Sequence, residues 1–148
     1  MFNYLILTKR PERITDCLPG DWGSGYPNVW LLVSTETQEL YRERWGILLG
    51  IPAAIRGLSA EPLLSPIVLT PPFPDWIITG GESDPVKPRL SDPAWFMSIA
   101  DQCRAEHIPL FHKQNGGSKK LDGHWGGREL DGRTWNQFPT INPKRIAI

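Results

Sequence analysis

Charged residues stand shortly after each of five short apolar segments of the sequence. The acidic ones are Glu36, Glu61 and Glu82, and the basic ones are Lys9 and Lys113. Carboxylates held close to cations can bind a polar substrate, an amino group or a divalent metal. The plainer alternative is that polar residues simply emerge into water where a strand ends. The sequence alone leaves both interpretations open.

The residues next to these charges complete the candidate site. Gly80 and Gly81 close one apolar segment and precede Glu82. Paired glycines let a backbone approach a ligand and expose amide donors, although they also occur in ordinary tight turns. We therefore expect a binding rim that consists of Lys9, Arg10, Glu36, Glu61, Gly80, Gly81, Glu82, Ser83, Lys113 and Gln114.

The histidines and cysteines do not form a metal-binding pattern. His107, His112 and His124 lack the i, i+4 spacing of helical zinc ligands, and Cys17 and Cys103 are far apart without a CxxC pair. A rim position for His112 stays open as an alternative. We expect the cysteines to be two buried, reduced thiols. No residue is assigned to metal binding or to catalysis.

The pattern of apolar residues predicts an α/β fold. The apolar runs are short and do not alternate, which is typical of strands buried on both faces. Helical patterns separate most of them, and the order β-α-β-α-β-loop-β-α-β predicts parallel strands with right-handed crossovers. The expected strands are residues 4–7, 29–33, 55–59, 76–79 and 108–111, and the expected helices are residues 11–18, 38–49 and 92–107.

Two of these helices have clear sequence signals. Asp92 is suited to cap the last helix and Pro93 to occupy its first turn. Gly50 is expected to close the helix over residues 38–49. The expected buried faces are Leu40, Ile47 and Leu48 in the earlier helix, and Phe96, Ile99, Ala100 and Cys103 in the later one.

Length and charge limit the class of protein. The 148 residues fit one domain, and a formal net charge of zero favours neither nucleic acid nor an anionic membrane as a partner. No apolar stretch approaches the ~20 residues of a membrane span. The first residues lead directly into a strand, without the pattern of a signal peptide. We expect a cytoplasmic protein that contacts no membrane.

The sequence changes character after Gln114. Residues 1–114 are expected to form a half-barrel α/β domain, and residues 115–148 a loop-rich tail with glycines, tryptophans and basic residues. The tail tryptophans either pack back on the domain or meet a partner. Trp and Arg dominate the energetics of protein interfaces, so the residues assigned to partner binding are Trp125, Arg133 and Trp135. Nucleic-acid binding by the same basic and aromatic residues is the less favoured alternative.

Several segments resemble, in order and over nearly the whole chain, the phage-protein family of domain of unknown function 5131. The matching segments are residues 7–13, 27–31, 58–64, 78–83, 101–103, 113–114 and 130–135. The resemblance implies a TIM-barrel-like fold and radical S-adenosylmethionine chemistry. In the relatives, that chemistry is implied to depend on an iron–sulfur cluster bound by an N-terminal cysteine triplet.

This chain resembles only the C-terminal half of that family. It lacks the cysteine triplet, and Cys17 and Cys103 cannot replace thiolates that converge on one cluster. It also has Thr37 and Asn115 where the family usually has Asn and an aromatic residue. We therefore expect a partial TIM-barrel-like parallel sheet of about five strands with flanking helices, and no cofactor bound by this chain.

Two functions are consistent with these features. The favoured one is a phage-type truncated barrel protein that is inactive as an enzyme alone and binds a protein partner, for example as an inhibitor of a host system. The alternative is the C-terminal subunit of a split radical-SAM-like enzyme whose rim binds a polar small molecule. Five parallel strands cannot close an eight-stranded barrel, so two unpaired sheet edges should favour a protein partner or a second copy.

Overall fold

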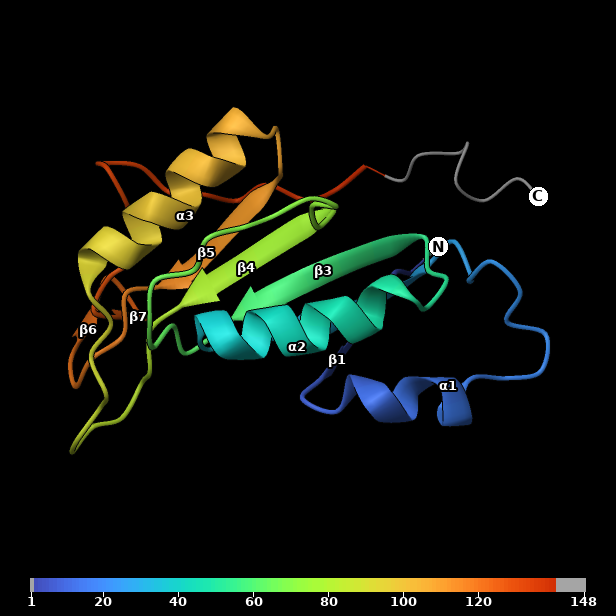
Figure 1. Ribbon diagram of the computed structural model, residues 1–148. Helices are drawn as coiled ribbons and strands as arrows, with labels where there is room; N and C mark the ends of the chain where they lie inside the picture. The colour runs from blue at the N-terminus through green and yellow to red at the C-terminus, as the bar shows by residue number, and fades with distance from the viewer. Residues whose placement is uncertain (1, 141–148) are drawn as a thin grey trace.

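The computed structural model describes residues 2–140 of the chain. Its main elements are β1 (Tyr4–Thr8), α1 (Ile14–Cys17), β2 (Val29–Ser34), α2 (Gln38–Leu49), β3 (Ile55–Ala60), β4 (Trp76–Gly80), α3 (Pro93–Ala105) and β5 (Leu110–Gln114). A 3-10 turn, η1 (Pro11–Arg13), precedes α1, and the short strands β6 (Lys120–Leu121) and β7 (His124–Trp125) form a hairpin in the tail. The α/β prediction is confirmed (Figure 1).

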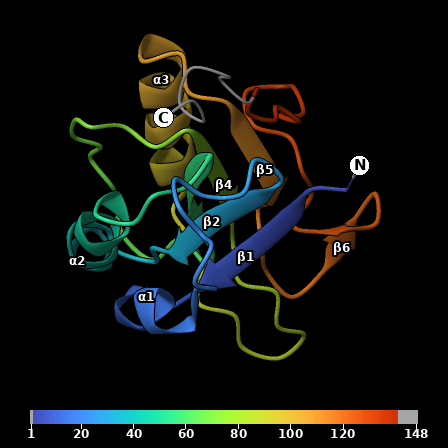
Figure 2. The same ribbon diagram turned by 90° about the vertical axis from the view of Figure 1, so that its right-hand side faces the viewer.

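The five main strands form one sheet in the order β1-β2-β3-β4-β5, and each neighbouring pair is parallel. This order confirms the parallel pairing predicted from the alternation of elements. Figure 2 shows the three helices on the same side of the sheet, as successive right-handed crossovers require. An all-parallel, sequential sheet with its helices on one face is consistent with part of a barrel.

Alternate residues of each strand enter two separate apolar layers. Leu31, Val33, Leu58 and Ile77 point toward the helices and belong to the main core. On the other face, a second cluster consists of Trp30, Leu32, Ile55 and Trp76. The central strands are therefore buried on both faces, as their apolar runs predicted.

The prediction of burial on both faces is wrong for β1. Tyr4, Leu5, Ile6 and Leu7 are between 47% and 59% exposed. Hydrophobicity alone does not separate an edge strand from a central one, because strand order is a property of the whole sheet. The opposite edge differs, because tail residues 135–137 lie against β5: His112 N donates to Trp135 O at 3.0 Å and Gln137 N to Leu110 O at 3.0 Å.

The helix α3 follows its sequence signals closely. Asp92 caps it by accepting a hydrogen bond from Ala94 N at 2.8 Å, and Pro93 opens the first turn. The four residues predicted to be buried are buried: Phe96, Ile99, Ala100 and Cys103. The prediction of two buried thiols is half wrong, since Cys17 is exposed.

The helix α2 has the predicted bounds and ends at Gly50, but its buried face differs from the prediction. Tyr41, Trp45 and Leu48 are buried, whereas Ile47 is 38% exposed. Tyr41 and Trp45, which are one turn apart, enter the core together with Leu48. The buried face of α2 is therefore rotated around the helix axis relative to the face predicted from its aliphatic residues. Trp45 Nε1 donates to Pro72 O at 3.0 Å and so also ties the helix to the following loop.

A proline-rich loop, residues 61–75, takes the place of a helix between β3 and β4. Its residues Leu63, Ile67 and Leu69 are buried in the main core. Side chains of the flanking helices satisfy its backbone: Val68 N donates to Gln38 Oε1 at 2.6 Å, and Leu69 N donates to Gln102 Oε1 at 2.7 Å. The loop therefore covers the sheet as a crossover helix would.

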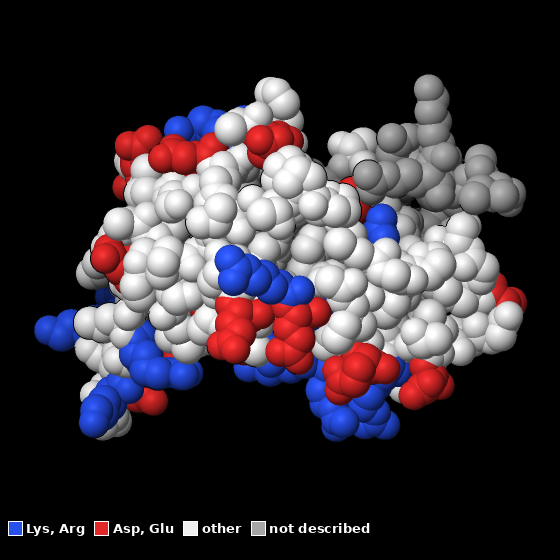
Figure 3. All heavy atoms as spheres, viewed as in Figure 1, with Lys and Arg blue, Asp and Glu red and all other residues white. Residues whose placement is uncertain are grey.

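Figure 3 shows acidic and basic side chains interspersed over the helix-bearing face, with a group of both signs near its middle. Among the described residues of that face, many basic side chains lie next to acidic ones, unlike the extended basic surface that binds a nucleic-acid backbone. Within the part of the chain that the structure describes, no helix is both long and apolar enough to span a membrane.

Candidate functional site

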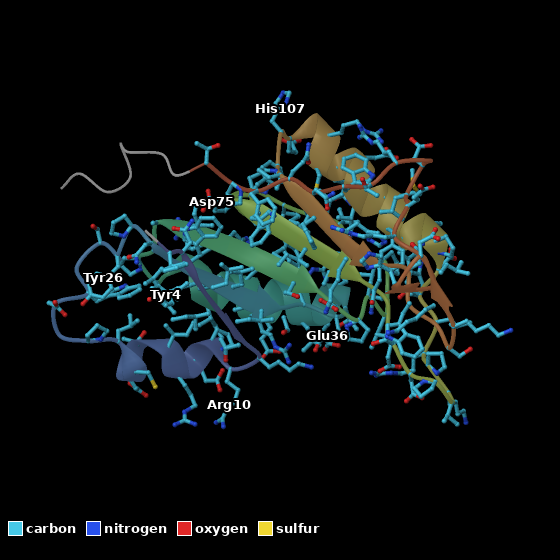
Figure 4. The ribbon with its side chains drawn as sticks, turned by 180° about the vertical axis from the view of Figure 1, so that it is seen from behind. Tyr4, Arg10, Tyr26, Glu36, Asp75 and His107 are labelled. Carbon is cyan, nitrogen blue, oxygen red and sulfur yellow. The ribbon has the colours of Figure 1, made fainter. Side chains whose placement is uncertain are left out.

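Most of the predicted site residues gather where the strands end. Parallel strands bring their carboxyl ends to the same end of the sheet, which we call the rim. The charged residues at or just after those ends are Lys9, Glu36, Glu61, Glu82 and Lys113. Figure 4 shows Glu36 at this end of the sheet, and His107 at the opposite end.

Glu36 is the most deeply placed carboxylate of the rim, with a side chain only 8% exposed. Lys9 Nζ lies 2.5 Å from Oε1, and Arg44 Nη1 lies 2.8 Å from Oε2. The same Arg44 nitrogen donates to Ser34 O at 2.8 Å, which fixes the guanidinium against the end of β2. Glu36 therefore carries a negative charge that two cations balance.

The pKa of Glu36 reflects this balance. Burial alone would raise the pKa of the carboxyl group, but hydrogen bonds from Lys9 and from the backbone, together with the charges of Lys9 and Arg44, lower it overall. Glu36 is consequently ionised at neutral pH and is a weak proton acceptor.

Glu61 forms a second pair across the rim with a residue of β5. Lys113 Nζ lies 2.6 Å from Glu61 Oε1, and the two side chains are 53% and 23% exposed. Gly80 makes room for this carboxylate, because a Cβ atom there would lie 3.2 Å from Cγ and Cδ of Glu61. The pair links the loop after β3 to β5 directly above the end of β4.

Glu82 forms a third pair, with Arg89 from the loop that follows β4. Arg89 donates to it from Nη2 at 2.5 Å and from its backbone N–H at 2.7 Å. The hydrogen bonds from Arg89, first from its side chain and then from its backbone, lower the pKa of Glu82 to about 2. The pKa of Arg89 is raised, mainly by Glu82 and to a smaller extent by the charge of Glu36, so the pairs share one electrostatic environment.

The chemistry available at the rim follows from these pairings. A general base works best when its pKa lies near the working pH. The lowered pKa values of Glu36 and Glu82 make both carboxylates poor proton acceptors at neutral pH. The arrangement thus suits charge-balanced contact with a polar group better than proton transfer.

The glycine pair at the end of β4 lies against the loop after β5. A Cβ atom at Gly81 would overlap the carbonyl group of Asn115. Gly81 N donates to Gln114 O at 2.9 Å, and Gln114 Nε2 donates back to Gly81 O at 3.2 Å. Ser83 forms an isolated bridge with Gly117. Close packing of two loops accounts for glycine here, and a ligand-binding role for Gly80 and Gly81 stays a prediction.

His112 lies beneath the rim and does not face it. Its ring is fully buried against Phe96, with Thr79 Oγ1 2.9 Å from Nδ1 and Asn115 Oδ1 3.1 Å from Nε2. Burial lowers the pKa of the imidazole to about 4, although the hydrogen bond that Nε2 donates to Asn115 Oδ1 opposes the shift. His112 is therefore a neutral residue that ties β4 to β5.

The donor groups for an iron–sulfur cluster do not come together in residues 2–140. Cys17 is exposed on α1, and Cys103 is buried on α3. Over the same residues, no group of three or more His, Cys, Asp and Glu side chains is arranged to hold a metal ion. The described residues do not fit the cluster that the family resemblance implies, so no chemistry is assigned to such a group here.

Tail residues assigned to partner binding have unlike environments. Trp135 is 3% exposed and packs in the main core, which corresponds to the alternative in which the tail packs on the domain. Arg133 is exposed, and its guanidinium carbon lies 3.7 Å from the centre of the Trp135 ring. Trp125 is half-buried in the hairpin, beneath Lys120. Contact of these residues with a partner stays a prediction.

Sequence reasoning missed the counterions Arg44 and Arg89. Arg42 and Arg44 both lie on α2 among its polar residues, and no local pattern distinguishes one from the other. Arg89 lies in a loop seven residues after Glu82, a separation without a characteristic pattern. Only the path of the chain around the rim brings these guanidiniums to their carboxylates.

A second candidate surface lies along β1. On the helix side of β1, Ile6 lines a cavity of about 200 Å³. Its other apolar walls are Leu31 of β2, Ile14 of α1 and Leu18 directly after α1. Arg13 and Cys17 lie at the same cavity. Arg10 also lines it and bonds to Glu12, 3.2 Å from Nε to Oε1, instead of joining the ion pairs of the rim. We call the exposed strand and this cavity the β1 edge.

A family described as "Protein of unknown function (DUF5131)" matches residues 1–139 of the chain. Searches of curated proteins and of solved structures give no match.

Proposed function

The chain belongs to the DUF5131 family of proteins of unknown function, and we propose that it acts by binding a protein partner along the β1 edge. The observation that carries this proposal is the exposure of Tyr4, Leu5, Ile6 and Leu7, all close to half, in a sheet whose central strands are buried. An exposed, apolar edge strand is a template for pairing with another chain.

The size of the apolar surface supports association. Full burial of an aliphatic side chain contributes about 1.5–3 kcal/mol. Leu5, Ile6 and Leu7 are each about half exposed, so covering them would contribute roughly 1 kcal/mol each. Backbone hydrogen bonds to the free side of β1 would add register and direction to this contact.

The partner can be described by the chemistry that the β1 edge offers. A strand would pair with β1, and an apolar segment, for example the face of a helix, would fill the cavity beside Ile6, Ile14 and Leu18. Arg10 and Arg13 at the same cavity favour acidic residues next to that segment. We therefore propose a partner that presents a strand and an adjacent apolar, acidic-flanked helix.

Because the tail covers the β5 edge, we place the proposed interaction at the β1 edge. Closing a barrel would require strands at both edges, and tail residues 135–137 already occupy the β5 edge. The charge-balanced rim pairs also suit a binding protein better than an acid–base catalyst. These features support partner binding. Inhibition of a host system by a phage-type protein is the specific form that we propose for it.

Cys17 provides a direct test. It is exposed at the cavity, whereas burial raises the pKa of Cys103 to about 12, so a maleimide should label only Cys17. We expect a partner bound from host lysate to protect Cys17 and to be lost from Ile6→Lys. The matched control is Val86→Lys, which adds the same charge at an exposed valine elsewhere.

The outcomes separate the alternatives. Retention of the same bound protein by Ile6→Lys, with Cys17 still protected, would exclude the β1 edge as the binding surface. Light scattering of the purified protein tests whether the partner is a second copy, since a dimer broken by Ile6→Lys would identify one.

The second candidate function is the C-terminal subunit of a split radical-SAM-like enzyme. The observation that favours it is the convergence of Glu36, Glu61 and Glu82, with their cations, on one rim. Its test is anaerobic iron–sulfur reconstitution of the chain together with a cluster-bearing partner. Absence of S-adenosylmethionine binding in that mixture would exclude the split enzyme.

A further inference from the structure

A cavity of about 640 Å³ lies away from the rim, where α3 ends and the tail returns over the sheet. Its lining includes Arg104, His107, Arg133, Trp135, Gln137 and Phe138. Figure 4 shows His107 at the end of the molecule opposite to Glu36. The volume is in the range of small-molecule sites. We call this space the Arg133 cavity.

Arg133 is held in place by a turn and an aromatic ring. Asp131 and Gly132 both have positive φ, 56° and 68°, as in the tight two-residue turns that Asp-Gly favours. Leu130 N donates to Arg133 O at 3.0 Å across this turn. The guanidinium carbon lies 3.7 Å from the centre of the Trp135 ring, and Trp135 Nε1 donates to Leu130 O at 3.2 Å.

This arrangement leaves the Arg133 side chain free to bind an anion. Within residues 2–140, no carboxylate lies within 4.0 Å of its nitrogens. Stacking on an indole ring orients a guanidinium without using its N–H donors. The planar donor fork is therefore pre-organised and unpaired beside a cavity.

Arg104 supplies a second cation to the same cavity. It lies in the last turn of α3, and its guanidinium carbon is 5.3 Å from the centre of the Trp135 ring. Asp101 binds it at 2.8 Å and Asp131 at 3.8 Å. Arg104 is thus partly neutralised, and Arg133 is the stronger anchor for an incoming anion.

An apolar side of the cavity offers a surface for a ring. Phe138 is 58% exposed, although it contacts Trp76 with ring centres 5.3 Å apart. Ile108 and Pro109 lie beside it in the lining. A ligand with an anionic group at Arg133 and a flat apolar group at Phe138 would use both sides of the cavity.

We propose that the Arg133 cavity binds a phosphate monoester carried on an aromatic ring, a ligand of the mononucleotide class. A phosphate dianion has three terminal oxygens and accepts hydrogen bonds from two guanidinium forks, whereas a carboxylate is satisfied by one. The cavity is also much larger than an isolated anion requires. This proposal is independent of partner binding at the β1 edge, because its residues lie on α3, in the segment between α3 and β5, and on the tail.

Calorimetry of the full chain with adenosine monophosphate tests the proposal, with adenosine and inorganic phosphate as partial ligands. We expect saturable binding of the monophosphate, and binding at least tenfold weaker for either partial ligand. Arg133→Gln should weaken monophosphate binding about tenfold or more. Asp131→Asn should strengthen it, because it removes a carboxylate that competes for Arg104.

Arg42→Gln is the matched control, since Arg42 is an exposed arginine of α2 outside this cavity. The opposite signs expected for the Arg133 and Asp131 variants distinguish a specific site from a loss of folding, which would weaken binding in both. Absence of saturable monophosphate binding to the wild-type chain would overturn the proposal. An equal loss of affinity in Arg42→Gln would also overturn it by showing non-specific attraction to positive charge.

Discussion

The strands β1 and β5 form the two edges of one sheet, yet their side chains have opposite environments. On β1, Leu7 is 51% exposed, whereas on β5 both Leu110 and His112 are fully buried. The difference arises from the chain segments next to each strand. Tail residues 135–137 bond to the outer side of β5, and α3 packs over it, while the described chain leaves the outer side of β1 unpaired.

This contrast shows how one sheet can combine stability with the capacity to associate. An edge that the protein covers with its own tail adds to the core and is protected from foreign strands. An edge strand left exposed contributes less to the stability of the fold. Its apolar surface can still be buried when a partner binds, and that burial would stabilise the complex. We therefore expect substitutions near β5 to act on stability and substitutions on β1 to act on binding.

The largest effect is expected at the tail residue that covers β5. Trp135→Ala should lower the free energy of unfolding by about 3–5 kcal/mol, because a buried indole is replaced by a cavity. Urea denaturation followed by circular dichroism measures this change. Trp125→Ala is the control, since Trp125 is only half-buried in the hairpin. Equal losses in the two variants would show that the tail does not stabilise β5 specifically.

The same substitution at the two edges tests the contrast directly. Leu110→Ala should cost about 3 kcal/mol, because Leu110 is fully buried in the main core. Leu7→Ala should cost about 1 kcal/mol, because half of its surface is already in contact with water. Thermal and urea unfolding of both variants give the comparison. Similar costs would mean that β1 is covered in solution.

The buried histidine of β5 predicts a pH dependence. The pKa of His112 is about 4, below the usual 6.5, so between these values the folded protein binds fewer protons than the unfolded chain. The neutral His112 side chain makes its full contribution to the free energy of unfolding above pH 6.5. That free energy should fall by on the order of 2–3 kcal/mol as the pH is lowered toward 4. Unfolding measured at several pH values in this window detects the slope.

A weaker dependence of the free energy of unfolding on pH in His112→Gln would confirm that His112 causes it. The control is His107→Asn, because His107 is exposed and has φ of 54°, a conformation that Asn tolerates. A wild-type slope retained in His112→Gln would assign the pH dependence to other groups.

The smallest effect is expected for the ion pair that joins β5 to the loop after β3. Glu61→Ala should change the free energy of unfolding by about 1 kcal/mol or less, because exposed pairs contribute little. A loss above about 2 kcal/mol would instead identify Glu61 as a structural partner of β5. Such a result would mean that the rim, as well as the tail, stabilises the covered edge.

Much of the fold could be predicted from local patterns. The bounds of α2, the Asp92 cap of α3 and the parallel order of strands follow from periodicity, capping and alternation. The gathering of Lys9 and Glu36 could also be predicted, because strand ends of a parallel sheet meet. These features depend on residues that are close in sequence, or on topology that short crossovers dictate.

Other features could not be read from local patterns. The exposure of Leu5 and the burial of Trp135 depend on which segments lie next to β1 and β5. Leu5 stands in an apolar run and Trp135 between polar residues, so the neighbouring sequence alone would suggest the opposite. The choice of Arg44 over Arg42 as the partner of Glu36 depends on a rotation of α2, set by Tyr41 and Trp45 in the core. Long-range packing decides each of these cases.

The sequence by itself determined the class of fold, the order of its elements and the end of the sheet where charged residues meet. Hydrophobic periodicity and turn residues act over a few positions, and these positions are adjacent in the chain. Only the tertiary structure decided which edge of the sheet is covered, which cation neutralises each carboxylate, and that Arg133 stacks on Trp135 beside a cavity. Those outcomes depend on contacts between segments far apart in sequence, whose free energies are fixed only when the whole chain packs.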